Sequence, residues 1–396
     1  MNIGIYFPNV KPEIGGGSTL LNTIQKEIKE SKDTEDNYYF LYDGKWREPL
    51  TKEFEDSYYI NLGFYRIGIF KKKIISKIKK LLHLHVSTVS KFNIVAKDFP
   101  IDIFWFPSPI DADLDYPYIY TVWDLGHRCI PYFPEVSRSG WTWNQRETCY
   151  QKMLYKASYV ITGNEEGKKQ IIENYPMPPN KIRISSFPVS SFCHGKEEKP
   201  SFEVPEQFFF YPAQFWPHKN HICILDALVL LRDKFNLYPT VFLTGSDQGN
   251  KEYIQDKIKE YNLESQVKLT GFLKYEEIKY LYTHATAMIF ASLMGPNNMP
   301  PIEATFLNCP VIITDLDGHK EQLKDTALYF NGYKADELAE NMNILLTDEL
   351  FRTQVKEKEK QLAESLDKIN YFLEIKKIIQ EFHLIRKTWG KDYIHL

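Results

Sequence analysis

Short apolar runs alternate with longer segments of helical periodicity along this chain, and that alternation limits the possible folds more than any other feature. The first six runs are IGIYF, YYFLY, IDIFWF, PYIYTVW, ASYVIT and KIRIS. Their nearly continuous apolar character is typical of parallel strands that are covered by helices on both faces. The first part of the sequence therefore predicts an α/β fold.

The alternation stops once and then begins again. Residues 191–207 are polar, charged and contain prolines, which predicts a linker. The runs QFFFYPA, TVFLTG, QVKLTGF, ATAMIFAS and TALYF follow it, again with helix-like segments between them. A chain of 396 residues exceeds the usual size of one hydrophobic core. We therefore expect one domain in residues 1–190, a second in 208–365 with a cleft between them, and helices in 366–396 that pack back on the first domain.

Composition excludes several classes of protein. The net charge of -3 argues against broad nucleic-acid binding. The opening MNIGIYFP predicts a first strand and not a signal peptide, and no run is long enough to span a membrane. The cysteines are odd in number and lack CxxC spacing, which favours reduced thiols in a cytoplasmic protein over disulfides or a zinc site. They are Cys129, Cys149, Cys193, Cys223 and Cys309.

A run of three glycines, Gly15, Gly16 and Gly17, follows the first predicted strand and precedes a helix that begins near Ser18. Consecutive glycines at such a turn let backbone N–H groups and the helix N-terminus face an anion. A tight turn without a ligand explains the same residues, and both interpretations stay open. The run is not GxGxxG, so it gives no support to a nicotinamide-dependent enzyme.

Two charged residues of the second half stand where predicted helices begin. Lys219 follows Pro217 in YPAQFWPHKNH, where its ammonium group would suit a diphosphate. A solvated surface lysine is the alternative. In GPNNMPPIEATFLNCPVIITD, two consecutive prolines predict a helix that starts near Pro301, with Glu303 in its first turn. The Glu303 carboxylate then either stabilises the helix terminus or binds the paired hydroxyls of a ribose.

Lys219 together with GPNNMPPIEATFLNCPVIITDLDGHKEQL resembles the donor half of the GT-B retaining glycosyltransferases of family 4, whose usual form is E-G-F-G-L-P-x-x-E-A followed by G-x-P-V. The resemblance covers nearly the whole chain, and residues 285–330 are its specific part. It implies two Rossmann-like domains whose parallel sheets face each other across a cleft. By the same resemblance, Glu303 matches the second glutamate of a Glu-x7-Glu pair, which holds the donor ribose, and Lys219 matches a diphosphate-binding lysine.

The sequence departs from that family pattern at two positions. Gly295 stands where the first glutamate contacts the transferred sugar, and Gln214 stands where an arginine binds phosphate. Asn297, Asn298 and Met299 occupy the loop whose backbone amides meet the sugar, and the two asparagine side chains would replace some of the lost hydrogen bonds. The donor-sugar preference of family members that keep both residues should therefore not be assigned to this chain.

In the first half, TVWDLGHRCIPYFPE resembles the family's H-D segment at the end of a strand. Trp123 stands at the histidine position, Asp124 matches the aspartate, and His127 follows three residues later. A contact of Asp124 or His127 with the sugar or the acceptor and a role in packing or helix capping both stay open. Gly318, His319 and Glu321 in DLDGHKEQL resemble a second phosphate-facing turn, for which a simple helix start is the alternative.

The sequence contains two D-x-D strings, Asp111 to Asp113 and Asp315 to Asp317. Such strings bind a metal–nucleotide complex in another glycosyltransferase fold. No cluster of metal-ligand residues accompanies them, so we interpret both as loops and expect chemistry that needs no metal. The resemblance implies no cofactor, only a nucleotide-diphosphate sugar as co-substrate.

Residues 66–82 carry seven basic side chains and no acidic one, with apolar residues on one helical face. This pattern is typical of a helix on an anionic membrane surface and equally of a solvated basic face whose apolar side packs on the domain, and both interpretations stay open. Membrane contact would suit an acceptor linked to polyprenyl diphosphate, as in bacterial surface polysaccharide assembly. A cytoplasmic protein at the inner face of the membrane is the corresponding expectation.

The sequence thus predicts a retaining transfer of a sugar from a nucleotide-diphosphate donor to a hydroxyl of a growing, lipid-linked glycan. The expected catalytic residues are Lys219, Asp124 and His127; the expected donor-binding residues are Gly16, Gly17, Gln214, Lys219, Asn297, Asn298, Met299, Glu303 and His319. A nucleotide-sugar epimerase, which would isomerise the donor without a glycan, and a silent nucleotide-sugar-binding scaffold protein are the alternatives.

Overall fold

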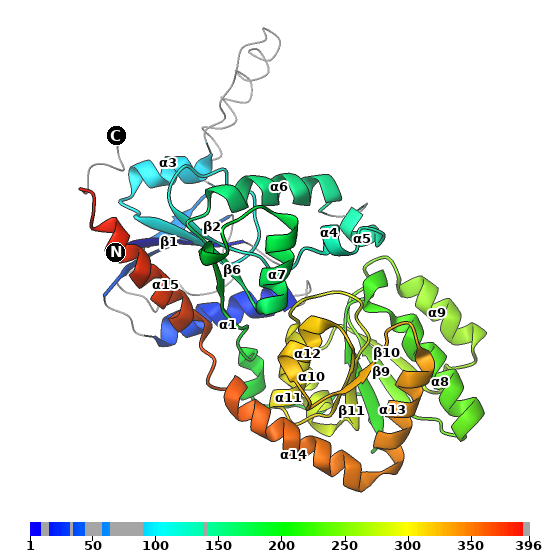
Figure 1. Ribbon diagram of the computed structural model, residues 1–396. Helices are drawn as coiled ribbons and strands as arrows, with labels where there is room; N and C mark the ends of the chain where they lie inside the picture. Colours follow the sequence, from blue (N-terminus) through cyan, green and yellow to red (C-terminus); the bar gives the residue numbers. More distant parts are fainter. Residues whose placement is uncertain (9–15, 32–34, 44–57, 64–89, 138–140, 391–396) are drawn as a thin grey trace.

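The computed structural model describes residues 1–8, 16–31, 35–43, 58–63, 90–137 and 141–390 (Figure 1). The basic segment 66–82 and Gly15 lie outside the described residues, so the expectation of membrane contact stays a prediction. Two parallel sheets, each covered by helices, form the two lobes of the molecule in Figure 1. The predicted α/β class is therefore confirmed.

The first sheet has seven strands in the order β3-β2-β1-β4-β5-β6-β7, and every neighbouring pair is parallel. All residues of β4, β5 and β6 are buried, which explains their continuous apolar sequence. The strands are β1 Asn2–Phe7, β2 Asn37–Tyr42, β3 Tyr58–Asn61, β4 Ile103–Phe106, β5 Tyr118–Thr121, β6 Tyr159–Thr162 and β7 Ile182–Ile184. The helices described around them are α1 Gly16–Glu30, α3 Lys91–Asp98, α4 Gly126–Cys129, α5 Pro134–Ser137, α6 Trp143–Lys156 and α7 Glu165–Asn174, with a 3-10 turn, η3, at Pro179–Lys181.

The second sheet has six parallel strands in the order β10-β9-β8-β11-β12-β13. They are β8 Phe208–Pro212, β9 Thr240–Thr244, β10 Val267–Gly271, β11 Ala287–Phe290, β12 Val311–Thr314 and β13 Leu328–Phe330. The helices are α8 His221–Phe235, α9 Lys251–Glu260, α10 Tyr275–His284, α11 Met299–Phe306, α12 Asp317–Leu323, α13 Ala335–Thr347, α14 Glu349–Leu366 and α15 Tyr371–Arg386. Two further 3-10 turns are η4 Ser191–His194, between the sheets, and η5 Pro217–Lys219.

Helix α11 begins at Met299, two residues before the predicted start near Pro301. Pro300 and Pro301 then occupy its second and third positions, where a backbone N–H has no partner within the helix and its loss does no harm. Glu303 consequently lies in the second turn of the helix and not in the first, so its carboxylate is not a terminal capping group.

In both sheets the order in which successive strands are added reverses beside the first strand. β1 lies between β2 and β4, and β8 lies between β9 and β11. The crevice at the carboxyl ends of the strands beside such a switch point is where open α/β sheets bind ligands. This topology brings the start of α1, the segment after β5 and the loops after β8 and β11 into one region between the sheets.

The last helix returns to the first sheet, where α15 (red) lies beside α1 (blue) in Figure 1. The backbone N–H of Phe372 donates to the carboxylate of Glu27 at 2.9 Å, and the Arg386 guanidinium donates to Asp102 at 2.7 Å. Tyr371 stacks on Trp105 and is fully buried. These contacts attach the end of the chain to the first sheet.

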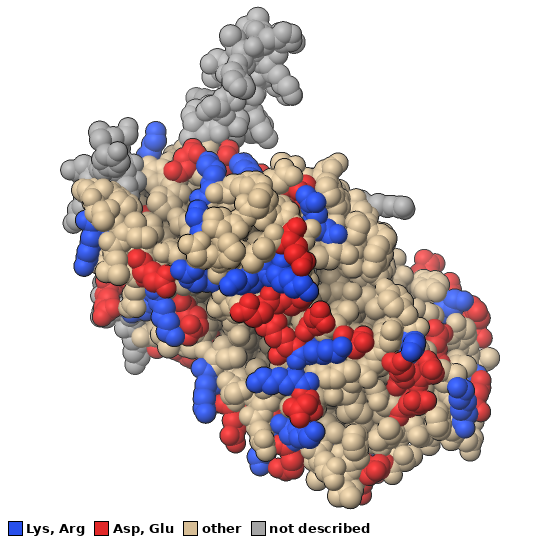
Figure 2. All heavy atoms as spheres, in the orientation of Figure 1, with Lys and Arg blue, Asp and Glu red and all other residues tan. Residues whose placement is uncertain are grey.

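Charges of both signs are mixed over the face shown in Figure 2, in keeping with the small net charge. All five cysteines are free thiols. Within the described ranges, no helix is long and apolar enough to cross a membrane.

Candidate active site between the two sheets

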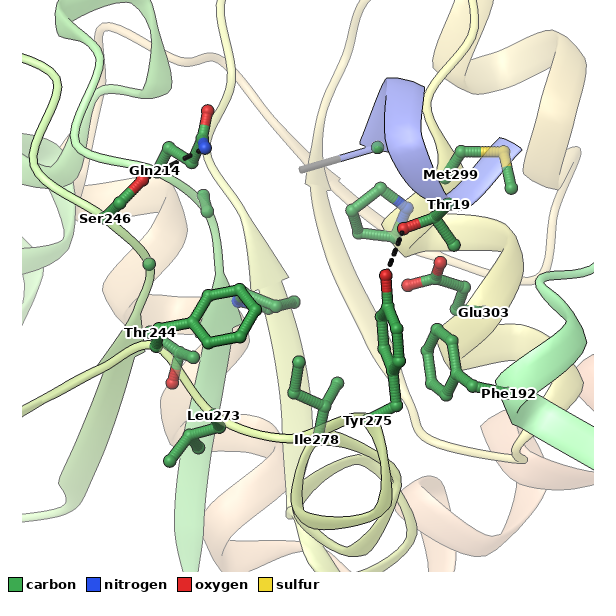
Figure 3. Close-up of a pocket in the computed structure, with 16 residues that line it drawn as sticks. Thr19, Phe192, Gln214, Thr244, Ser246, Leu273, Tyr275, Ile278, Met299 and Glu303 are labelled. Carbon is green, nitrogen blue, oxygen red and sulfur yellow. Dashed lines mark hydrogen bonds between the residues drawn. The ribbon is translucent and has the colours of Figure 1, made fainter. Parts of the chain in front are cut away.

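Three cavities lie in a row between the two sheets. The aromatic cavity is lined by Phe272 and Tyr275 and reaches Glu303 (Figure 3). The central cavity contains Lys219, and the outer cavity extends from Asp124 to the start of α12. Gly16, Gln214 and Met299 line both the aromatic and the central cavity, whereas Asp124, Met294 and Gly295 line both the central and the outer cavity. One elongated ligand can therefore occupy the first two cavities and meet a second ligand in the third.

Two helix N-termini converge on the central cavity. Gly16 and Gly17 open α1, Met299 opens α11, and all three residues line the cavity. A Cβ added at Gly17 would lie 2.6 Å from the Trp123 ring, so only glycine allows this packing. The first N–H groups of α1 and the dipoles of both helices favour an anion between them, whereas Pro300 and Pro301 at the start of α11 have no N–H to donate.

Lys219 brings a cation to the same cavity. It ends η5, and Asn220, in the left-handed conformation at φ 55°, turns the chain into α8. Lys219 Nζ donates to Ser292 Oγ at 3.3 Å and lies 4.9 Å from the centre of the Phe290 ring. Burial lowers its pKa to about 8, although the carboxylates of Asp124 and Glu135 act in the opposite direction. Among the described carboxylates, none forms an ion pair with Lys219, so a bound anion would be its counter-charge.

Glu303 projects from α11 toward the aromatic cavity and is only 6% exposed (Figure 3). Its carboxylate accepts hydrogen bonds from Ser190 Oγ and from Tyr282 Oη, the latter at 2.9 Å. Burial raises the pKa of Glu303, and these two hydrogen bonds oppose the rise. Each oxygen retains lone pairs that can accept a hydroxyl of a ligand, and the two protein donors fix the orientation of the carboxylate.

The loop between β11 and α11 requires glycine at position 295. Gly295 has φ +118°, and a Cβ there would lie 2.6 Å from Asn298 Nδ2. The Asn298 amide thus occupies the space that a side chain of residue 295 would enter. Its Nδ2 donates to His319 Nε2 at 2.9 Å, while His319 Nδ1 donates to the Thr314 carbonyl at 2.9 Å. Burial lowers the pKa of His319 to about 4, so the imidazole is neutral and orients Asn298.

The same loop is held by Gln322 of α12, which sequence analysis missed. Gln322 Oε1 accepts from the Asn298 N–H at 3.0 Å and its Nε2 donates to the Asn298 carbonyl at 2.9 Å and to Asn297 Oδ1. The Asn297 side chain lies against Gly163, which directly follows β6 of the first sheet, and any Cβ at Gly163 would collide with it. The donor-side loop is therefore positioned by residues of both halves.

The two candidate residues of the segment after β5 lie in different surroundings. Asp124 lines the central and outer cavities, and its Oδ1 accepts from the Gly126 N–H at 2.8 Å. His127 is fully buried, and its Nε2 lies 3.2 Å from both Glu147 Oε2 and Tyr175 Oη. The structure does not bring His127 to the three cavities, because α4 turns the imidazole toward the buried carboxylate of Glu147.

Gln214 lines both inner cavities; its Nε2 donates to Ser246 Oγ at 3.1 Å, and its Oε1 accepts from Trp216 Nε1 at 3.0 Å. The aromatic residues Phe272 and Tyr275 were not singled out from the sequence. The signal that would find them is their place directly after β10, at the carboxyl end of the sheet.

The two D-x-D strings differ in their surroundings. Asp111 and Asp113 form ion pairs with Lys152 at 2.9 and 3.0 Å. Asp315 and Asp317 are exposed and line the outer cavity. In the part of the chain that the structure describes, no three His, Cys, Asp or Glu side chains gather in a group suited to a metal ion.

Residues 196–362 match the family model described as "Glycosyl transferases group 1". The O-antigen chain mannosyltransferase RfbU of Salmonella typhimurium is 28% identical over 192 residues, which cover 46% of this chain and 50% of that protein. The serotype-specific mannosyltransferase WbdA of Escherichia coli is 24% identical over 225 residues, which cover 54% of this chain and 28% of that protein. This chain therefore spans half or less of the length of these relatives.

A crystal structure of a glycosyltransferase from Rickettsia africae has a TM-score of 0.67 at 15% sequence identity, with 98% of this chain and 99% of that chain covered. Similarity at this level of identity concerns the fold alone. The expected GT-B arrangement of two parallel sheets is confirmed.

Proposed function

Because the chain belongs to the glycosyl transferases group 1 family through residues 196–362, we propose that it is a retaining glycosyltransferase. It moves a sugar from a nucleotide-diphosphate donor to a hydroxyl of a growing surface glycan. The observation that carries this proposal is the half-buried Lys219, which forms no ion pair with any described carboxylate, in a cavity where two helix N-termini converge. That site is suited to a diphosphate.

The donor extends through the two inner cavities. Its base lies in the aromatic cavity near Phe272 and Tyr275, and the paired ribose hydroxyls donate to Glu303. Its diphosphate lies between Lys219 and the N-termini of α1 and α11, so that the transferred sugar reaches Asn298. The order of these groups along the cavities matches the order of the parts of a sugar nucleotide.

Catalysis consists of positioning two substrates and stabilising the leaving diphosphate. The bond between the anomeric carbon and the β-phosphate oxygen breaks, and the phosphate leaves with its electrons. The acceptor oxygen forms the new bond to the anomeric carbon on the same face of the sugar, and its proton passes to the departing phosphate. Lys219 and the backbone N–H groups stabilise the charge that develops on the phosphate oxygens. We propose that this chemistry needs no metal ion, with the diphosphate neutralised by the protein.

We propose mannose as the transferred sugar because the two named relatives are mannosyltransferases. The acceptor glycan occupies the outer cavity, which meets the central cavity at Asp124 and Gly295. Carboxylates of Glu166, Asp315 and Asp317 line this cavity and are suitable acceptors for sugar hydroxyls.

The test is a set of incubations with GDP-mannose, UDP-glucose, UDP-galactose and ADP-glucose, each with and without a mannose-terminated oligosaccharide, in EDTA and in Mg²⁺. We expect mannose transfer from GDP-mannose, equal in both buffers. Donor isomerisation without acceptor would favour an epimerase, and nucleotide binding without any reaction would favour a scaffold protein. Transfer only in Mg²⁺ would contradict the proposal that no metal is needed.

A further inference from the structure

A buried pair of side chains joins the two halves of the chain beside Lys219. Glu135 lies on α5 of the first half, and His218 lies in η5 of the second half, directly before Lys219. Glu135 Oε1 accepts from the His218 backbone N–H at 3.0 Å and from His218 Nδ1. The side chains of His218 and Glu135 are only 6% and 5% exposed. The contact therefore exists only while the two halves are together.

The charges of this pair bear on Lys219. Burial lowers the pKa of His218; burial also raises the pKa of Glu135, but the hydrogen bonds from His218 outweigh it and leave that pKa lowered. At neutral pH a Glu135 carboxylate thus accepts from a neutral His218, whose Nδ1 carries the proton. Glu135 Oε2 is buried and has no hydrogen-bond partner in the structure. The carboxylate helps to keep Lys219 protonated, as does Asp124.

We propose that Glu135 is a positioning residue through which closure of the two halves completes the diphosphate site. Its hydrogen bond to the His218 N–H fixes η5, and η5 places the Lys219 ammonium group in the central cavity. When the halves separate, η5 loses this support and Lys219 loses a neighbouring negative charge. The inference rests on the proposed function, in which Lys219 stabilises the leaving diphosphate. It adds that Lys219 reaches its final position only when the two halves close.

A second bridge between the halves serves as a matched control. The Glu321 carboxylate of α12 accepts from the backbone N–H groups of Glu165 and Glu166 at 2.8 and 3.0 Å. It joins the same two halves but is exposed and does not contact η5. Loss of Glu321 weakens closure alone, whereas loss of Glu135 weakens closure and also changes the surroundings of Lys219.

The experiment compares Glu135→Gln, Glu135→Ala and Glu321→Gln with the wild type in kcat, donor KM and the pH dependence of kcat. The described charged and titratable groups that act on Lys219, or are acted on by it, are Asp124, Glu135, His218, His221 and His319. Removal of the Glu135 charge should shift the alkaline limb of the profile to lower pH. We expect Glu135→Gln to lower kcat at least tenfold and to move this limb, while Glu321→Gln leaves the limb in place.

Binding of GDP and UDP to the same proteins, measured by calorimetry at pH 7 and pH 9, provides a readout independent of turnover. We expect the Glu135 variants to lose more affinity between the two pH values than the wild type. If the wild type binds but Glu135→Gln differs only in melting temperature, or matches Glu321→Gln in every respect, this inference is wrong and the proposed function stands. If the wild type binds neither nucleotide, the proposed function is wrong and this inference with it.

Discussion

The loop after β11 and the segment after β5 both leave the carboxyl end of a buried parallel strand and both lead into a helix, yet they expose their polar residues differently. Asn297 and Asn298 of the loop after β11 line the central cavity. In the second, Asp124 lines that cavity, whereas His127 points into the core of the first half.

The lengths and neighbours of the two helices explain this difference. Helix α11 has eight residues with prolines near its start, so its direction follows from local sequence. Helix α4 has only four residues, and the buried Glu147 of α6 attracts His127 from another part of the chain. A polar residue at the end of a strand therefore indicates a site only when no buried partner competes for it.

The largest effect is expected on the donor side. Lys219→Ala should reduce kcat by roughly 100- to 1000-fold, the usual loss when one preorganised charge-stabilising group is removed. Steady-state kinetics measures kcat of this variant. Lys234→Ala is the control, because Lys234 is exposed near the end of α8. Turnover of Lys219→Ala within a factor of three of the control would remove Lys219 from the leaving-group site.

Glu303→Gln tests the ribose contact. We expect nucleoside diphosphate binding to weaken by about 1–3 kcal/mol, because one oxygen that would accept from a ribose hydroxyl is replaced by an amide donor. Calorimetry measures the change. The control is Glu359→Gln, a buried glutamate of α14 that accepts from the Val311 N–H at 3.0 Å and lies outside the three cavities. Equal affinities of the two variants would show that Glu303 has a structural role only.

The pH dependence of binding sharpens the assignment of Lys219. With a pKa lowered to about 8, Lys219 is mostly protonated at pH 7 and mostly neutral at pH 9. Nucleoside diphosphate affinity should fall as the pH rises through about 8, by no more than tenfold per pH unit for a single proton. An anion raises this pKa, so binding near pH 8 should take up a proton, measurable by calorimetry in buffers of different ionisation enthalpy. Lys219→Met should abolish the uptake; persistence of the uptake would assign it to another group.

Asn298→Ala tests whether the amide beside Gly295 contacts the transferred sugar. Loss of one hydrogen bond, about 1 kcal/mol or roughly fivefold, should reduce the affinity for GDP-mannose relative to GDP. The affinity for GDP itself is the internal control, because Asn298 lines the central cavity and not the aromatic cavity in which we propose that the base binds. An equal loss for both ligands would mean that the substitution disturbs the whole loop.

The smallest effect on activity is expected at His127. His127→Asn removes hydrogen bonds to Glu147 and Tyr175 and the stacking on Tyr150, so the free energy of unfolding should fall by roughly 1–3 kcal/mol. In protein that remains folded, kcat/KM should stay near the wild-type value. A large loss of kcat/KM with an unchanged melting temperature would mean that His127 takes part in the reaction. The segment after β5 and the loop after β11 would then both supply functional side chains.

The sequence by itself determined the α/β class and most of the strands and helices, because buried parallel strands and glycine- or proline-marked helix starts are local patterns. It missed β3, and it placed the start of α11 two residues late. It also selected Lys219, Glu303 and Asn298, since each follows a strand that ends at a ligand-binding edge, although their roles in binding stay predictions.

Only the tertiary structure decided the order of the strands, the inward orientation of His127 and the partners of the loop after β11. Gln322 reaches Asn298 across 24 residues of sequence, and Glu135 reaches His218 across 83. A buried polar group needs a hydrogen-bond partner, but the sequence does not state which distant residue supplies it. The order of the strands and the closure of the two halves determine the partner, because they bring together segments that are distant in the sequence. Nothing in the local sequence of either segment indicates the contact.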